Sequence, residues 1–245
     1  MNANDPPTRV SALQRIRPIL DLVATLTMTA AALTVMGVAL FSSGGRAGGG
    51  APRKPPVEAV TGLTLTIAPE QVVNKGARTV LVEYTDYECP FCARYAIDTY
   101  PEIRRRFVDT GDVEYVTRNF PLERLHPSAF KASEAAECAR DQGRYAPMRD
   151  VLFAHQRTLA QVDFAQQART LGLDVAQYGG CLNGRMRARI EAEQADGNRL
   201  GITTTPTFLV GRIRADGHVT LVTRVTGAQP YDTFKSVIEA AMRAN

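Results

Sequence analysis

The sequence predicts an α/β fold with an all-helical domain inserted into its middle, preceded by an N-terminal transmembrane helix. Three observations predict it. Segments with strand character and segments with helical spacing alternate at both ends of residues 61–245. Residues 126–200 between them show helical spacing only. Residues 22–41 form an uncharged apolar run that is long enough to span a bilayer.

The N-terminal region is predicted to be a cytoplasmic tail, residues 1–21, followed by a signal anchor, residues 22–41. Arginines flank the apolar run on both sides, so positive charge alone does not determine its orientation. The run is longer than the usual core of a cleaved signal peptide, and no strong A-x-A site follows it. Cleavage near Ser42 is the alternative. Residues 42–60 are rich in Gly and Pro and are expected to form a linker.

The net charge of +4 comes from the N-terminal segment. Residues 1–57 hold six Lys and Arg against two Asp and Glu, whereas residues 58–245 hold 23 of each kind. The folded part is therefore neutral and lacks the overall positive charge that a nucleic-acid-binding domain needs. No nucleic-acid partner is expected.

The folded part is expected to open with a short strand at residues 63–67 and then a β-α-β unit. Residues 79–85 predict a strong strand, residues 89–107 a helix, and residues 113–120 the next strand. Gly111 separates the helix from that strand. Such a unit implies parallel pairing and a right-handed crossover.

A helical block and a β-β-α unit complete the chain. Glycines divide the block into five helical stretches. These stretches cover residues 127–141, 144–156, 163–171, 174–182 and 185–200. Two strands, residues 207–213 and 219–225, flank a turn signal, and a helix over 231–243 follows. The order assigns residues 61–125 and 201–245 to one domain and residues 126–200 to the inserted helical domain.

The motif Cys89-Pro90-Phe91-Cys92 lies where the strong strand meets the first helix, which is the layout of a thiol–disulfide redox site. If Cys89 is the N-cap, Pro90 falls at the first helical position, which suits proline. Unpaired N–H groups and the positive end of the helix dipole then lower the pKa of the Cys89 thiol. The sequence predicts an exposed, nucleophilic Cys89 and a more buried resolving Cys92.

The motif has two other possible roles, a structural zinc site and a structural disulfide. A structural zinc site needs about four Cys or His ligands, usually with a second short-spaced pair. Cys138 and Cys181 stand apart and the three histidines form no such pair, so no metal and no cofactor is expected. A purely structural disulfide across so short a loop would remove little entropy from the unfolded chain.

Three stretches, taken in order, carry a family resemblance: VEYTDYECPFC, RNFPLERLHPSAFKASEAAECA and CLNGRMRARIEAEQADGNRLGITTTPTFLVG. Over about residues 60–243 the chain resembles the DsbA-like thiol–disulfide oxidoreductases. The resemblance implies a thioredoxin fold with an inserted helical domain. It also implies protein or peptide thiols as substrates, and a membrane redox partner that resets the CxxC pair.

The resemblance assigns roles around the motif. It makes Pro206 a cis proline facing the CxxC pair, although a trans proline opening the strand is the alternative. A fixed bend there leaves the backbone of Thr205 free to pair with an extended substrate. With Pro90 and Phe91, these residues are expected to bind substrate.

Glu83 lies six residues before Cys89 on the strong strand. A buried acid is costly unless it serves a purpose. The resemblance implies that Glu83 is catalytic and helps proton transfer at Cys92. The alternative is a carboxylate at the strand end that faces solvent.

The resemblance also implies a structural disulfide between Cys138 and Cys181, with two buried free thiols as the alternative. Disulfide chemistry belongs outside the cytoplasm. The domain is therefore expected in the periplasm or on the exterior of the cell envelope, anchored in the membrane or, alternatively, secreted after signal cleavage.

The expected function is the introduction of disulfides into extracytoplasmic protein thiols. Phe91 departs from the family's best-known oxidases, which carry histidine in this dipeptide; phenylalanine donates no hydrogen bond. A disulfide reductase or isomerase of the same fold is thus an alternative, and a non-catalytic peptide-binding or chaperone module is another. His126 is expected to be structural.

Overall fold

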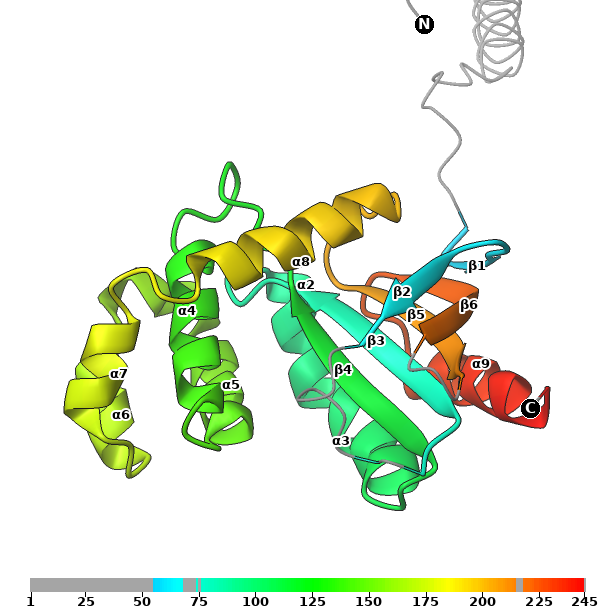
Figure 1. The fold of residues 1–245 in the computed structure, drawn as a ribbon, viewed down its shortest axis with the longest axis horizontal. Helices are drawn as coiled ribbons and strands as arrows, with labels where there is room; N and C mark the ends of the chain where they lie inside the picture. The colour runs from blue at the N-terminus through cyan, green and yellow to red at the C-terminus, as the bar shows by residue number, and fades with distance from the viewer. Residues whose placement is uncertain (1–54, 68–73, 75, 215–217, 245) are drawn as a thin grey trace, which may run out of the picture. The chain divides into compact units, whose positions relative to one another are not determined.

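The computed structural model describes residues 55–67, 74, 76–214 and 218–244 (Figure 1). The expected tail, residues 1–21, and anchor, residues 22–41, lie outside these residues, as does most of the expected linker. Within the described ranges, no helix is both long and apolar enough to cross a membrane.

A mixed sheet forms the centre of the fold. Its strands are β1 (Val57–Ala59), β2 (Thr64–Thr66), β3 (Thr79–Thr85), β4 (Val113–Asn119), β5 (Thr207–Ile213) and β6 (His218–Thr226). Their order is β1-β6-β5-β3-β4, and β2 also pairs with β6. β3 pairs in parallel with β4 and antiparallel with β5, so it is central, and all seven of its residues are buried. Its apolar side chains cover both faces, as a central strand requires.

The helical elements are α2 (Pro90–Arg94), η2 (Tyr95–Thr99), α3 (Tyr100–Ile103), η3 (Arg104–Val108), α4 (Ala129–Arg140), α5 (Tyr145–Ala154), η4 (Gln156–Gln161), α6 (Phe164–Thr170), α7 (Val175–Cys181), α8 (Arg187–Arg199) and α9 (Tyr231–Arg243). Alternate residues of β3 face opposite sides of the sheet. Leu81 packs in one cluster with Phe107 of η3 and Phe234 of α9. Tyr84 packs on the other side with Phe120 and Leu200.

The helix that follows the CxxC motif is less regular than predicted. One regular helix was expected over residues 89–107, but the chain alternates α-helical turns with two π-helical segments, Tyr95–Thr99 and Arg104–Val108. Pro101 lies between them and has no N–H to bond to the preceding turn. A wider turn beside such a residue relieves the missing bond without ending the helix.

The expected linker is shorter than predicted. Residues 42–60 were assigned to it, but Val57–Ala59 form strand β1, which pairs antiparallel with Thr223–Val225 of β6. Three residues give too short a pattern to predict a strand by alternation. Strand β6 supplies the pairing partner, which only the folded sheet presents.

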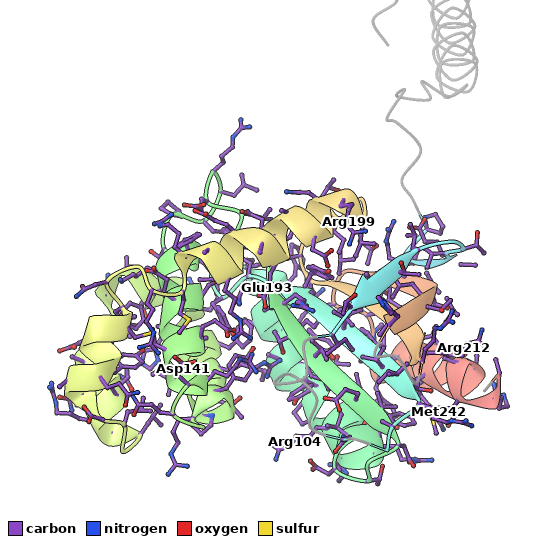
Figure 2. All side chains as sticks on the ribbon, in the orientation of Figure 1. Arg104, Asp141, Glu193, Arg199, Arg212 and Met242 are labelled. Atoms are coloured by element: carbon purple, nitrogen blue, oxygen red, sulfur yellow. A yellow bond between two sulfur atoms is a disulfide. The ribbon has the colours of Figure 1, made fainter. Side chains whose placement is uncertain are left out.

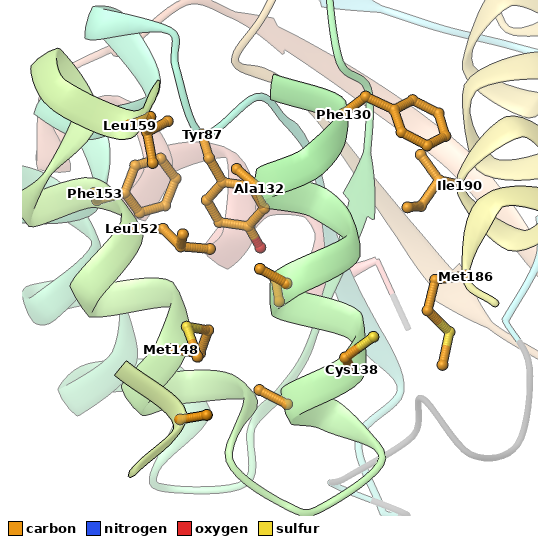
Figure 3. Close-up of a cluster of buried hydrophobic side chains, with 14 of the residues drawn as sticks. Tyr87, Phe130, Ala132, Cys138, Met148, Leu152, Phe153, Leu159, Met186 and Ile190 are labelled. Carbon is orange, nitrogen blue, oxygen red and sulfur yellow. The ribbon is translucent and has the colours of Figure 1, made fainter. Parts of the chain in front are cut away.

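The inserted helices build their own hydrophobic core (Figure 3). In it, Tyr87 of the β3–α2 loop lies among Leu152, Phe153 and Leu159. Cys138 on α4 and Cys181 at the end of α7 form a disulfide with a Cα–Cα distance of 5.8 Å, which confirms the predicted pairing.

Helix α8 extends from this core over the sheet (Figure 1). Gly197 allows the close approach, because a Cβ atom there would lie 2.7 Å from the Phe120 ring. Nearby, the Asn119 side-chain amide donates hydrogen bonds to Glu137 (3.0 Å) and to Glu193 (2.8 Å), so three buried polar groups join the inserted domain to β4. Figure 2 labels Glu193 on α8.

Glu193 gives this junction a pH dependence. Burial, and then the charge of Glu137, raise the pKa of Glu193 above its usual 4.5. Because the folded pKa is raised, the stabilising contribution is present below the unfolded pKa and is lost as pH rises through the folded value.

Glu193→Gln is therefore expected to flatten the fall in the free energy of unfolding that wild type shows as pH rises above about 4.5. Urea unfolding followed by circular dichroism between pH 4 and 7 measures this. Glu191→Gln, on the exposed side of the same helix, is the matched control and should keep the wild-type slope. A wild-type slope in Glu193→Gln would contradict the assignment.

Candidate active site

The two motif cysteines lie at the start of α2, as predicted. Cys89 is the N-cap residue with extended backbone angles, and Pro90 occupies the first helical position. Both cysteines are free thiols. The expectation of an exposed Cys89 was wrong: its relative exposure is only 4%, and that of Cys92 is 0%. The loop before β5 covers Cys89, whose thiol lies 3.4 Å from the carbonyl oxygen of Thr205.

The two thiols differ in acidity. The pKa of Cys89 is lowered to about 6, first by its hydrogen bond with the Cys92 thiol and further by bonds from Thr205 and from the N–H groups of Cys92 and Phe91. These outweigh the opposing effect of burial. Burial, followed by interactions with Cys89, raises the pKa of Cys92 well above its ordinary value. At neutral pH, Cys89 is thus mainly thiolate and Cys92 is a thiol.

The residues expected to bind substrate surround this pair. The Thr205–Pro206 peptide bond is cis, which confirms that prediction. The Pro206 carbonyl accepts a hydrogen bond from the N–H of Gly227, which ties the loop to the end of β6. Pro90 is exposed, and Phe91 is 53% exposed, so both present apolar surface beside Cys89. Their binding role stays a prediction.

Glu83 lies in the interior, so the solvent-facing alternative was wrong. It is fully buried on β3. One of its oxygens, Oε2, accepts a hydrogen bond from the Tyr115 hydroxyl at 2.5 Å and lies 3.4 Å from Nη2 of Arg149. Its proton-transfer role at Cys92 stays a prediction.

Arg149 was missed by sequence reasoning. It belongs to α5 of the inserted domain and is 3% exposed, with its guanidinium over the ring of Tyr100 at 4.3 Å. Sixty-six residues separate it from Glu83. No local pattern could identify the pair, because the fold alone brings the two elements together.

Asp86 was also missed. One carboxylate oxygen accepts hydrogen bonds from the N–H groups of Glu88 (2.8 Å) and Cys89 (3.2 Å). The other accepts from the N–H of Leu122 and lies 2.8 Å from Nδ1 of His126. This buried carboxylate therefore shapes the active-site turn and fixes it to the loop after β4. An Asp that begins a turn is a local signal that could have identified the first role.

The described part of the chain contains no cluster of three or more His, Cys, Asp or Glu residues able to hold a metal ion. The groups around the cysteines instead favour thiol chemistry: an acidic nucleophile, a buried partner thiol and a buried carboxylate.

Comparisons with known proteins agree with this geometry. A family model described as thioredoxin matches residues 72–240. Over 164 residues the chain is 41% identical to a Na+/H+ antiporter NhaA 1 from Mycobacterium sp. strain KMS, a match that covers 64% of this chain and 26% of the antiporter. The chain thus corresponds to about a quarter of the length of the curated relatives it matches.

Solved structures of DsbA proteins share the fold. A variant of alpha-DsbA1 from Wolbachia pipientis aligns with a TM-score of 0.64 and 21% identity, covering 74% of this chain and 94% of that one. DsbA2 from Pseudomonas aeruginosa aligns with a TM-score of 0.54 and 25% identity, covering 67% and 88%. Given the family match over most of its folded part, the chain belongs to the thioredoxin family, and it shares its fold with the DsbA proteins.

Proposed function

We propose that the chain introduces disulfides into extracytoplasmic protein thiols through the Cys89–Cys92 pair. The lowered pKa of Cys89, about 6, carries the proposal. Stabilising the Cys89 thiolate lowers the free energy of the reduced pair relative to the Cys89–Cys92 disulfide. The disulfide form therefore tends to oxidise substrate thiols and become reduced.

The exchange runs in two steps. A substrate thiolate attacks the sulfur of Cys89 in the Cys89–Cys92 disulfide, forming a mixed disulfide and releasing Cys92 as a thiolate that takes up a proton. A second substrate thiolate then attacks the substrate sulfur of the mixed disulfide, and Cys89 leaves as its stabilised thiolate. The substrate loses two electrons and gains a disulfide, and the pair is reduced to two thiols.

Substrate binding is proposed at the rim of the pair. The backbone of Thr205, next to Pro206, would hold an extended segment by strand addition. The exposed ring of Phe91 and the neighbouring Pro90 would contact apolar side chains of that segment.

The proposed setting is the membrane surface outside the cytoplasm. The apolar run 22–41 would anchor the chain, and a membrane redox partner would reoxidise Cys89 and Cys92. Relatives named as Na+/H+ antiporters support a membrane-linked setting, since an antiporter works across a membrane. The topology can be tested with a cysteine introduced into residues 42–54 of the chain. In intact cells it is expected to react with an impermeant maleimide, and protection from the reagent would contradict the proposed orientation.

Oxidising character is testable through the reduction potential of the pair. Equilibration with glutathione buffers, followed by alkylation and mass spectrometry, is expected to give a value above about −270 mV, the potential of thioredoxin. The alkylation rate of Cys89 is expected to fall as pH drops below about 6, because protonation removes the thiolate. A potential at or below that of thioredoxin would instead favour a reductase.

Two assays separate the other functions. Recovery of activity from scrambled ribonuclease measures isomerase activity, which the proposal expects to be minor. A peptide-binding or chaperone module would keep its activity when both motif cysteines are replaced by serine, whereas the proposed oxidase would lose it.

A further inference from the structure

A pocket of about 260 Å³ lies between α3, η3, β4 and α5. Its lining includes Tyr115 and Arg149 together with the exposed Arg104 and Asp150. Figure 2 labels Arg104. One water molecule occupies about 30 Å³ of liquid volume, and charged and hydroxyl-bearing side chains are among the lining residues, so the pocket can hold water in contact with bulk solvent.

Glu83 is not among the residues that line this pocket. Two residues that line the pocket contact Glu83: Tyr115, whose hydroxyl lies 2.5 Å from Oε2, and Arg149, whose guanidinium lies 3.4 Å from the same oxygen. A guanidinium does not release its proton in proteins, whereas a hydroxyl both donates and accepts. Tyr115 is therefore the group that can pass a proton.

The second oxygen of Glu83, Oε1, is buried and makes no hydrogen bond within the described residues. It is the oxygen of Glu83 that is left free to take or give a proton. Negative charge on Glu83 is among the causes that raise the pKa of Cys92, so the two groups lie within electrostatic reach. Cys92 itself is 0% exposed.

Cys92 must exchange a proton in every cycle. The loop at Thr205 already covers the Cys89 sulfur, and a bound substrate would cover that side further. Solvent then has no direct access to Cys92 from the substrate side, whereas water in the pocket can supply protons from the other side.

We propose that Tyr115 is a proton-relay residue that acts through Glu83 and connects Cys92 to water in this pocket. When the disulfide opens, the Tyr115 hydroxyl gives its proton to the Glu83 carboxylate and takes one from water. Glu83 in turn passes a proton to the Cys92 thiolate. In the reverse direction each proton moves the other way, and no electrons pass through the relay. The relay rests on the proposed exchange at Cys89 and Cys92.

Tyr115→Phe tests the relay because it removes the hydroxyl and keeps the ring. The measurement is the rate at which dithiothreitol reduces the Cys89–Cys92 disulfide, by acid quench and alkylation, since the chain contains no tryptophan to report by fluorescence. Tyr115→Phe is expected to be about tenfold slower at pH 7, which is less than the contribution of a direct general acid, roughly 10²-fold or more, because Tyr115 acts through Glu83. Its solvent deuterium isotope effect should exceed that of wild type.

Tyr84→Phe is the matched control. Tyr84 is the next residue to Glu83 on β3, and its buried hydroxyl also donates to a carboxylate, Asp196, at 3.0 Å, but on the opposite face of the sheet. It should react within twofold of wild type, with an unchanged isotope effect.

A Glu83→Gln background separates the relay from a structural role. If Tyr115 acts through Glu83, adding Tyr115→Phe to Glu83→Gln produces no further slowing. A Tyr115→Phe rate within twofold of Tyr84→Phe, or a tenfold loss that persists in Glu83→Gln, would overturn the relay. Failure of the proposed function itself would look different: disulfide exchange would then survive in a Cys89→Ser variant.

Discussion

Replacing Cys89 by serine is expected to abolish disulfide exchange, with a loss of at least about 10³-fold in activity. Serine forms no disulfide, so no mixed disulfide with substrate can form at position 89. Cys92 cannot substitute for it, because its sulfur is fully buried and its pKa is raised by burial. Turbidity of insulin during reduction by dithiothreitol measures the loss.

Cys92→Ala is the companion variant. It keeps the nucleophile but removes the resolving thiol, so it should accumulate a mixed disulfide at Cys89 that non-reducing gels and mass spectrometry detect. Wild-type insulin reduction by Cys89→Ser, or no trapped adduct in Cys92→Ala, would contradict the assignment of the two roles.

Removing the Cys138–Cys181 disulfide is expected to lower the free energy of unfolding by about 4 kcal/mol, since it closes a loop of 43 residues. Both sulfurs are buried in the helical core, so Cys138→Ala with Cys181→Ala also loses some packing. For a chain of this size the melting temperature should fall by roughly 10 °C.

The comparison is best made in a chain that already carries serine at Cys89 and Cys92, so that no other disulfide forms during unfolding. Urea unfolding of this chain with and without the alanine pair isolates the effect of Cys138–Cys181. A difference below about 1 kcal/mol would mean that the bond barely constrains the unfolded chain. The motif variant alone should keep near-wild-type stability, because it removes only a very short loop.

Elements with a strong local pattern could be predicted from sequence. The strands Thr79–Thr85 and Thr207–Ile213 and the helix Tyr231–Arg243 have the bounds that their apolar spacing indicated. Strand β1 could not be predicted, because its residues form a strand only by pairing with β6. The π-helical turns could not be predicted either, because a proline such as Pro101 can end, kink or widen a helix, and the surrounding structure decides which.

The candidate site divides in the same way. The position of Cys89 at the helix start follows from adjacent residues, so its lowered pKa could be anticipated. Its burial could not, because the covering Thr205 comes from a segment 116 residues away. The contacts of Glu83 with Tyr115 and Arg149 likewise join three elements that only folding brings together.

The contact between Arg149 and Glu83 makes the thioredoxin core depend on the inserted domain. The cation comes from α5, whereas the acid lies in the thioredoxin core. Deleting residues 126–200 would leave an unpaired charge in the interior, at a cost of about 3–5 kcal/mol. A descendant that lost the insertion would need a neutral residue at position 83 or a cation from the core itself. The helical insertion and the core acid are therefore energetically dependent on each other, although 66 positions of sequence separate the two residues.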